Sequence, residues 1–113
     1  MNLEFLKDGL SLNAIISGEL DHHVIGALRE NIDFKLSMGI YRTLCLDLRN
    51  VTFMDSSVIA LIMGRAKNME KHNGKVVVKV GDRTAEKILN LSGIKDYVTV
   101  IYEERNNNNG NIE

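Results

Sequence analysis

The sequence predicts an α/β fold in which a mixed β-sheet of four to five strands packs against α-helices. After Leu20, segments with the alternating pattern of a strand take turns with segments of helical periodicity, and this order requires crossover connections between parallel strands. Before Leu20, two short apolar segments flank Lys7-Asp8-Gly9. They predict a hairpin, which would add antiparallel strands at one edge of the sheet.

The size and composition are those of one globular domain, which we place at residues 1–104. The chain has 113 residues, of which 44% are hydrophobic and 26% charged, enough for one core. A net charge of −1 gives no electrostatic reason to expect nucleic acid or a membrane as a partner. Residues 105–113 are too polar to bury, and we expect a disordered polar tail.

The cysteine content and the hydropathy pattern indicate the compartment. Cys45 is the single cysteine and lies in a predicted buried strand, which is typical of a core thiol in a reducing compartment. No apolar run approaches the roughly 18 residues that a membrane span requires. We therefore expect a cytoplasmic protein.

The first half of the predicted domain consists of the hairpin and a helix. Residues 2–7 and 10–17 have strand character. Asp21 is placed to cap the helix that follows, and Gly39 to end it. The apolar residues of this helix recur every four positions, at Val24, Leu28, Ile32 and Leu36.

The central strand and helix form the segment around which the chain is organised. At residues 43–48, leucines alternate with Cys45 and Asp47, as expected for a strand with one buried face. Residues 49–54 are predicted as a loop. The helix that follows should end at Asn73-Gly74, because glycine readily adopts the left-handed conformation. Its predicted buried stripe consists of Ile59, Ile62, Met63, Ala66 and Met69.

The last elements are a strand, a short helix and a final strand. The Val-Val-Val run within residues 75–80 predicts burial on both faces. Gly81-Asp82 should start the helix and Ser92-Gly93 should end it. Its apolar side would be Ala85, Ile88, Leu89 and Leu91, and residues 97–102 are predicted as the final strand.

The candidate site is the junction between the central strand and its helix, where Asp55, Ser56 and Ser57 stand at a helix N-terminus. Unpaired backbone N–H groups and the helix dipole favour negative charge there, including phosphate. Asp and Ser are also the commonest N-caps, and most Asp-Ser-Ser runs before an apolar helix are caps and nothing more.

Several motifs in order resemble those of the anti-sigma factor antagonists of the STAS family. They are Gly18-Glu19-Leu20-Asp21-His22-His23, Phe53-Met54-Asp55-Ser56-Ser57, Gly64-Arg65, Gly74-Lys75-Val76-Val77-Val78 and Leu91-Ser92-Gly93-Ile94. The resemblance covers residues 3–102. His22-His23, with no proline nearby, is most similar to the sporulation members of the family.

The resemblance implies a STAS fold and a partner-switching function. In the family, an anti-sigma factor that is itself a serine kinase phosphorylates the serine that matches Ser57. The unphosphorylated antagonist binds this kinase with its ATP or ADP and thereby releases the sigma factor, and a serine phosphatase restores that form. We expect Asp21, Asp55, Ser56 and Ser57 to contact the partner, with His22 and His23 as weaker candidates, and we expect no cofactor.

The residue after Ser57 departs from the family pattern. Relatives usually have glycine there, whereas this chain has Val58, a bulkier and stiffer residue. We expect Val58 to hinder the approach of the kinase. Val58→Gly would then speed phosphorylation and cost only about 0.5 kcal/mol of helix stability.

Other functions have weaker support in the sequence. Ser57, the histidines and Asp55 contain the residue types of a hydrolase triad, but no Gly-x-Ser-x-Gly elbow is present. A metal site is not expected, because adjacent His22 and His23 should point in different directions. A STAS regulatory module outside a sigma pathway, as in a stressosome-like assembly, and a small nucleotide-binding protein remain as alternatives, although no Walker-type phosphate loop is present.

Overall fold

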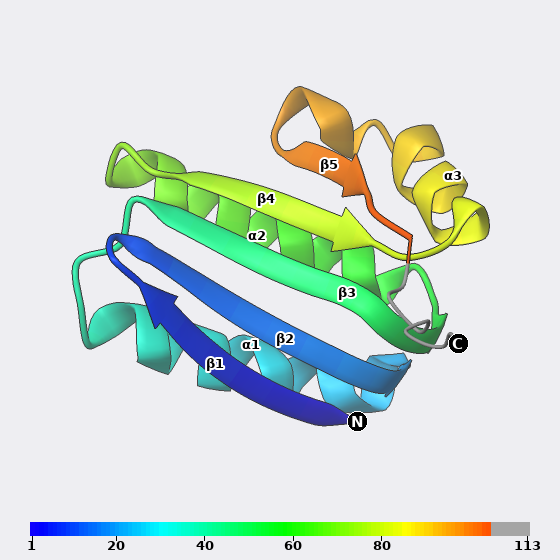
Figure 1. Ribbon diagram of the computed structural model, residues 1–113, viewed down its shortest axis with the longest axis horizontal. Coiled ribbons are helices and arrows are strands. Elements are labelled where there is room, and N and C mark those ends of the chain that lie inside the picture. Colours follow the sequence, from blue (N-terminus) through cyan, green and yellow to red (C-terminus); the bar gives the residue numbers. More distant parts are fainter. Residues whose placement is uncertain (105–113) are drawn as a thin grey trace, which may run out of the picture.

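A computed structural model describes residues 1–104 of the chain. In this part, five strands form a single sheet in the order β1-β2-β3-β4-β5, which follows the sequence (Figure 1). The elements are β1 (Asn2–Asp8), β2 (Ser11–Leu20), α1 (His22–Ser37), β3 (Thr43–Met54), α2 (Ser57–Lys71), β4 (Lys75–Val80), α3 (Arg83–Leu91), a 3₁₀ turn (Ile94–Asp96) and β5 (Thr99–Tyr102).

The pairing within the sheet confirms the predicted mixed topology. β1 and β2 form an antiparallel hairpin, while β2 to β5 are parallel neighbours. Gly9 makes the tight turn of the hairpin with a φ of +61°, a conformation that glycine adopts without strain. The predicted tail at residues 105–113 lies outside the described residues.

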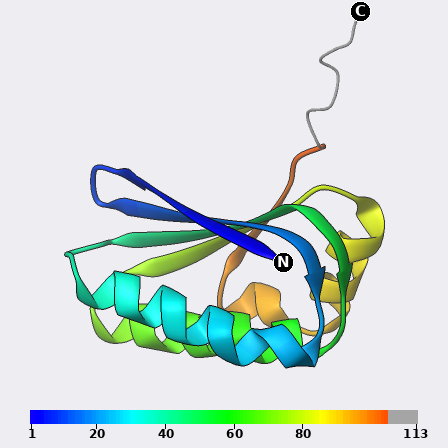
Figure 2. The ribbon, with the colours of Figure 1, turned by 90° about the horizontal axis from the view of Figure 1, so that it is seen from below.

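The helices of the described chain lie on one side of the sheet, as Figure 2 shows for α1 and α2. Their apolar faces and the inward residues of the strands form one core. In α1, the buried residues are Ile25, Leu28 and Ile32, with Val24 and Leu36 partly buried. The predicted stripe is therefore right at its centre and rotated slightly at its start.

The buried stripe of α2 differs from the prediction. Val58, Leu61, Ile62, Arg65, Ala66 and Met69 are buried, whereas Ile59 and Met63 are only partly buried. Arg65 reaches α1, where its Nε lies 2.9 Å from Asp33 Oδ1. The ion pair with α1 thus allows the charged Arg65 to be buried, and hydrophobic periodicity does not identify such a position.

β3 continues to Met54, so the predicted loop at residues 49–54 is wrong. Two register shifts against β2 give β3 extra residues, one between Asp47 and Asn50 and one between Val51 and Phe53. Such bulges interrupt the inward and outward alternation of a strand and increase its twist. The end of β3 curls towards the helix layer, and Figure 2 shows this bend.

The end of α2 also differs in detail from the prediction. α2 ends at Lys71, and Asn73, not Gly74, adopts the left-handed conformation, with φ of 62°. Gly74 is required for space, because a Cβ there would lie 2.9 Å from the Arg42 carbonyl oxygen. Glycine is thus needed at position 74, but because of the limited space and not because of a left-handed conformation.

The C-terminal elements are more exposed than predicted, and β5 is shorter. Val77 is only half-buried, so β4 buries one face rather than two. In α3, Ala85 and Leu89 are buried, whereas Ile88 and Leu91 are exposed. The 3₁₀ turn lies just before the predicted final strand, and β5 begins at Thr99, two residues later than predicted.

Cys45 is buried and free, as predicted. It lies on β3, on the side of the sheet opposite the neighbouring buried leucines. Both faces of the central strand therefore exclude water at this point, and the prediction of a single buried face is wrong. Burial raises the pKa of the Cys45 thiol above its ordinary value, as expected when the charged thiolate loses its hydration.

Candidate functional site

The N-termini of α1 and α2 meet at one end of the sheet. β2 and β3 are parallel neighbours, and each leads directly into a helix. The Asp55 amide N–H donates to the Leu20 carbonyl oxygen at 3.3 Å. The two strands therefore deliver Asp21 and Asp55, which are 34 positions apart in the sequence, to the same place.

Asp21 caps α1, as predicted. Its backbone is extended, with φ of −95° and ψ of 175°, and its carboxylate accepts the His23 amide N–H at 2.9 Å. This bond satisfies one of the N–H groups that a helix start leaves without an internal acceptor.

Asp55 serves both helices. Its Oδ1 accepts the Ser57 amide N–H at 2.9 Å and also the Ser57 hydroxyl. Its Oδ2 accepts the His22 amide N–H, in the first turn of α1, at 3.1 Å. The hydrogen bond from the Ser57 hydroxyl, followed by that from the Ser57 amide, lowers the pKa of the Asp55 carboxyl, because both stabilise the ionised form.

The two serines have different environments. Ser56 is exposed, and its side chain makes no capping hydrogen bond. Ser57 is half-buried and its hydroxyl is held by Asp55. Ser57 thus lies in the first turn of α2 as predicted, but its hydroxyl is oriented by a carboxylate.

Val58 turns away from this surface. Its side chain is fully buried, with 0% exposure, and belongs to the core under the sheet. The expectation that it obstructs a kinase at the surface is therefore wrong in its premise.

His22 and His23 lie beside the two carboxylates. His22 Nδ1 is 3.8 Å from Asp55 Oδ2, and His23 Nδ1 is 3.5 Å from Asp21 Oδ1. Their ring centroids are 4.0 Å apart, with the ring planes tilted by 36°, so the expectation that they point in different directions is wrong. Among residues 1–104, no group of three or more His, Cys, Asp or Glu side chains is arranged to hold a metal ion.

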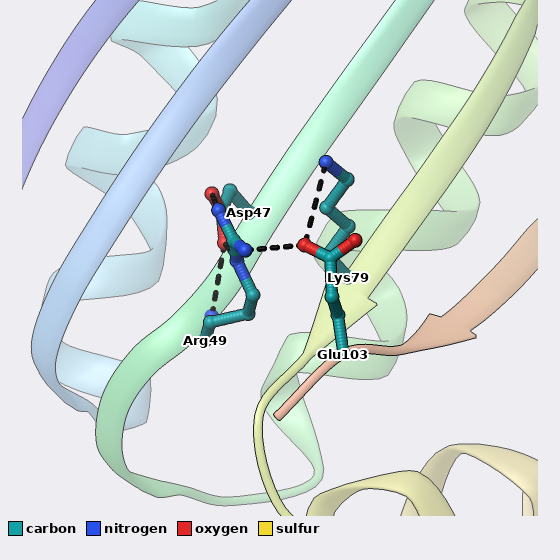
Figure 3. A network of polar contacts seen from close by, with 4 residues as sticks. All are labelled: Asp47, Arg49, Lys79 and Glu103. Carbon is teal, nitrogen blue, oxygen red and sulfur yellow. Dashed lines mark hydrogen bonds and ion pairs between the residues drawn. The ribbon is translucent and has the colours of Figure 1, made fainter. Parts of the chain in front are cut away.

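A second polar cluster lies on the sheet, on β3, β4 and the residue after β5 (Figure 3). Arg49 Nη2 lies 2.8 Å from Asp47 Oδ2, and Arg49 Nη1 contacts the Glu103 carboxylate. Lys79 Nζ is 3.8 Å from the same Glu103 oxygen. These ion pairs, together with a hydrogen bond from the Glu103 amide to the Val80 carbonyl oxygen at 2.9 Å, fix the chain after β5 to the sheet. We assign them a structural role.

The sequence places the acids and serines at helix starts, but it does not indicate the bond between Asp55 and the start of α1. That bond depends on the pairing of β2 with β3. The available signal in the sequence was that an aspartate stands at the start of each helix that follows these strands. No helix among the described residues is long and apolar enough to cross a membrane.

Comparisons with known proteins relate the chain to proteins of one family. The STAS domain model matches residues 13–107. An anti-sigma F factor antagonist from Lysinibacillus sphaericus is 31% identical over 88 residues, which cover 78% of this chain and 75% of the relative. An anti-sigma-B factor antagonist from Bacillus subtilis is 22% identical over 100 residues, which cover 88% and 90% of the two chains.

Solved structures show the same fold. The anti-sigma factor antagonist SpoIIAA in its unphosphorylated form matches with a TM-score of 0.78 at 21% identity, over 99% of this chain and 100% of that one. The Bacillus cell fate determinant SpoIIAA in the phosphorylated form matches with a TM-score of 0.69 at 24% identity, over 90% and 93%.

Proposed function

The chain belongs to the STAS domain family, and we propose that it is an anti-sigma factor antagonist that phosphorylation of Ser57 switches off. The unphosphorylated protein binds a cognate anti-sigma factor, a serine kinase carrying ATP or ADP, and releases the sigma factor. A serine phosphatase restores the binding form. Two relatives named as anti-sigma F factor antagonists, each 31% identical, support the binding function. The hydrogen bond from the Ser57 hydroxyl to Asp55 carries the assignment of the switch.

The hydrogen bonding supports Ser57 rather than Ser56 as the acceptor in the proposed phosphoryl transfer. The Ser57 hydroxyl donates a hydrogen bond to Asp55, which leaves the oxygen lone pairs free for an incoming phosphorus atom. In the transfer, the Ser57 oxygen bonds to the γ-phosphorus of ATP, the bond from that phosphorus to the bridging oxygen breaks, and ADP leaves. The proton of the hydroxyl passes to a base, and the Asp55 carboxylate already accepts it in the resting state.

Phosphorylation changes the charge of this surface. A phosphate adds about −1.5 to −2 charge units beside the Asp55 carboxylate and removes the hydroxyl proton that Asp55 accepts. The start of α2 tolerates this charge, because its N–H groups and dipole favour an anion. A partner packed against Ser57 meets added bulk, hydration and negative charge. A penalty of about 3 kcal/mol would weaken the complex roughly a hundredfold.

The test uses the full chain, the cognate anti-sigma factor and ATP. Mass spectrometry should place the phosphate on Ser57, and calorimetry should show that the phosphorylated protein binds roughly a hundredfold more weakly. Ser57→Ala should stay binding-competent without being phosphorylated, while Ser57→Asp should bind weakly and melt like the wild type. Ser56→Ala, the matched control, should behave like the wild type.

Two results would overturn the proposal. Phosphate on Ser56 instead of Ser57 would refute the assignment of the switch, and undiminished binding by the phosphorylated protein would refute its mechanism. Titration with nucleotide alone, followed by titration with the anti-sigma factor, distinguishes the protein from a nucleotide-binding protein. Only the second titration should produce heat.

A further inference from the structure

A groove lies next to the Ser57 site, between the end of β3 and α3. Its volume is about 400 Å³. The lining residues are Val51, Thr52, Phe53 and Met54 from β3, and Asp82, Thr84, Ala85 and Ile88 from α3 and its cap. Met54 directly precedes Asp55, so the groove and the switch share one continuous stretch of chain.

The walls of the groove expose large apolar side chains. Phe53 is 52% exposed and Ile88 is 39% exposed. The second bulge of β3 places Phe53 outside the core, because it shifts the register with β2 between Val51 and Phe53. A half-exposed phenylalanine beside a hollow is typical of a surface that a partner covers.

The rim of the groove carries negative charge. Exposed Glu19 lies opposite Phe53 in the β2–β3 register, Asp55 follows the groove in the chain, and Asp82 lines it. Two cations flank the lining residues in the sequence: Arg83, which is engaged by Glu86 at 2.8 Å, and exposed Lys87, so the acidic side chains outnumber them. The complementary ligand therefore combines apolar side chains with positive charge.

We propose that this groove is the specificity-determining part of the docking surface for the anti-sigma factor, and that it binds an amphipathic helix with lysine or arginine beside its apolar residues. The proposal rests on the proposed function. An apolar side chain of that helix packs between Phe53 and Ile88, while its cations face Glu19 and Asp55. The helix then lies directly beside Ser57, which explains how a phosphate there would disturb it.

Substitution of the groove tests the proposal with the cognate anti-sigma factor. Phe53→Ser and Ile88→Ser should each weaken binding about tenfold or more, as expected for apolar residues at the centre of an interface. In the phosphorylation assay, they should raise KM more than they lower kcat. Leu91→Ser is the matched control, because Leu91 is 78% exposed on the same helix but does not line the groove.

These variants separate the groove from the switch. If Phe53→Ser binds as tightly as the wild type while Ser57 is still phosphorylated, the groove proposal is wrong and the proposed function stands. If Leu91→Ser weakens binding as much as Phe53→Ser, the groove has no special role. Thermal melting of each variant checks that a loss of binding is not a loss of folding.

A second experiment does not depend on the anti-sigma factor. A synthetic amphipathic helix of leucine and lysine is titrated into isotope-labelled full-length protein, and a leucine and glutamate helix serves as the charge-reversed control. The lysine peptide should shift the amide resonances of residues 51–54 and 82–88, and the glutamate peptide should not. Equal shifts with both peptides, or shifts confined to other residues, would overturn the proposed chemistry of the groove.

Discussion

Val58→Gly should destabilise the protein strongly, because the side chain that it removes is fully buried. Loss of a buried valine side chain costs about 2 kcal/mol in apolar burial. Glycine within a helix adds about 1 kcal/mol relative to alanine. The expected loss is therefore about 3 kcal/mol, several times the value that helix propensity alone predicts, and at about 4 °C per kcal/mol it lowers Tm by about 12 °C.

Two control variants divide this loss into its parts. Val58→Ala should cost about 2 kcal/mol, the burial part alone. Ala60→Gly changes an exposed position of the same helix and should cost about 1 kcal/mol, the backbone part alone. Urea denaturation of the four proteins measures these differences.

The same variants test the kinase hypothesis. Because the Val58 side chain points into the core, Val58→Ala should be phosphorylated on Ser57 at the rate of the wild type at temperatures where both are folded. If Val58→Gly loses no more stability than Ala60→Gly, the burial argument is refuted. If Val58→Ala is phosphorylated several times faster, the side chain does obstruct the kinase.

Three further predictions follow from the polar and thiol groups. Asp55→Ala should lower Tm more than Ser56→Ala in calorimetry, because Asp55 accepts amide hydrogen bonds from both α1 and α2 whereas the Ser56 side chain makes no capping bond. Equal melting temperatures would contradict the role of Asp55 at both helix starts. Burial acts to raise the pKa of Asp47, but the hydrogen bonds and charge of Arg49 outweigh it and lower that pKa below its ordinary value near 3.8. The Asp47 carboxylate therefore stabilises the fold above its ordinary pKa, and this stability is lost as pH falls through the lower pKa of the folded state. The urea midpoint of the wild type should consequently fall more steeply on acidification below pH 4 than that of Asp47→Asn. Iodoacetamide should modify Cys45 slowly in the folded protein and rapidly in urea, because burial shields the thiol and raises its pKa; similar rates in both states would show that the strand opens readily.

The sequence by itself determined the kinds of elements and their order. Hairpin, helices and parallel strands follow from side-chain periodicity, which depends only on positions close together in the chain. The caps Asp21 and Asp82 were also readable, because a capping side chain bonds to an amide two or three residues ahead. For the same reason, the pairing of Asp55 with Ser57 lies within reach of sequence reasoning.

Only the tertiary structure decided how these elements are set against one another. The bulges that extend β3 to Met54 exist only in its register with β2, and local alternation breaks down where they occur, which is why the segment resembles a loop in sequence. The rotation of α2 that buries Val58 is set by its packing under the sheet and against α1. The bond from His22 to Asp55 joins residues 33 positions apart, and it forms because the pairing of two parallel strands, a nonlocal interaction, brings two helix starts together.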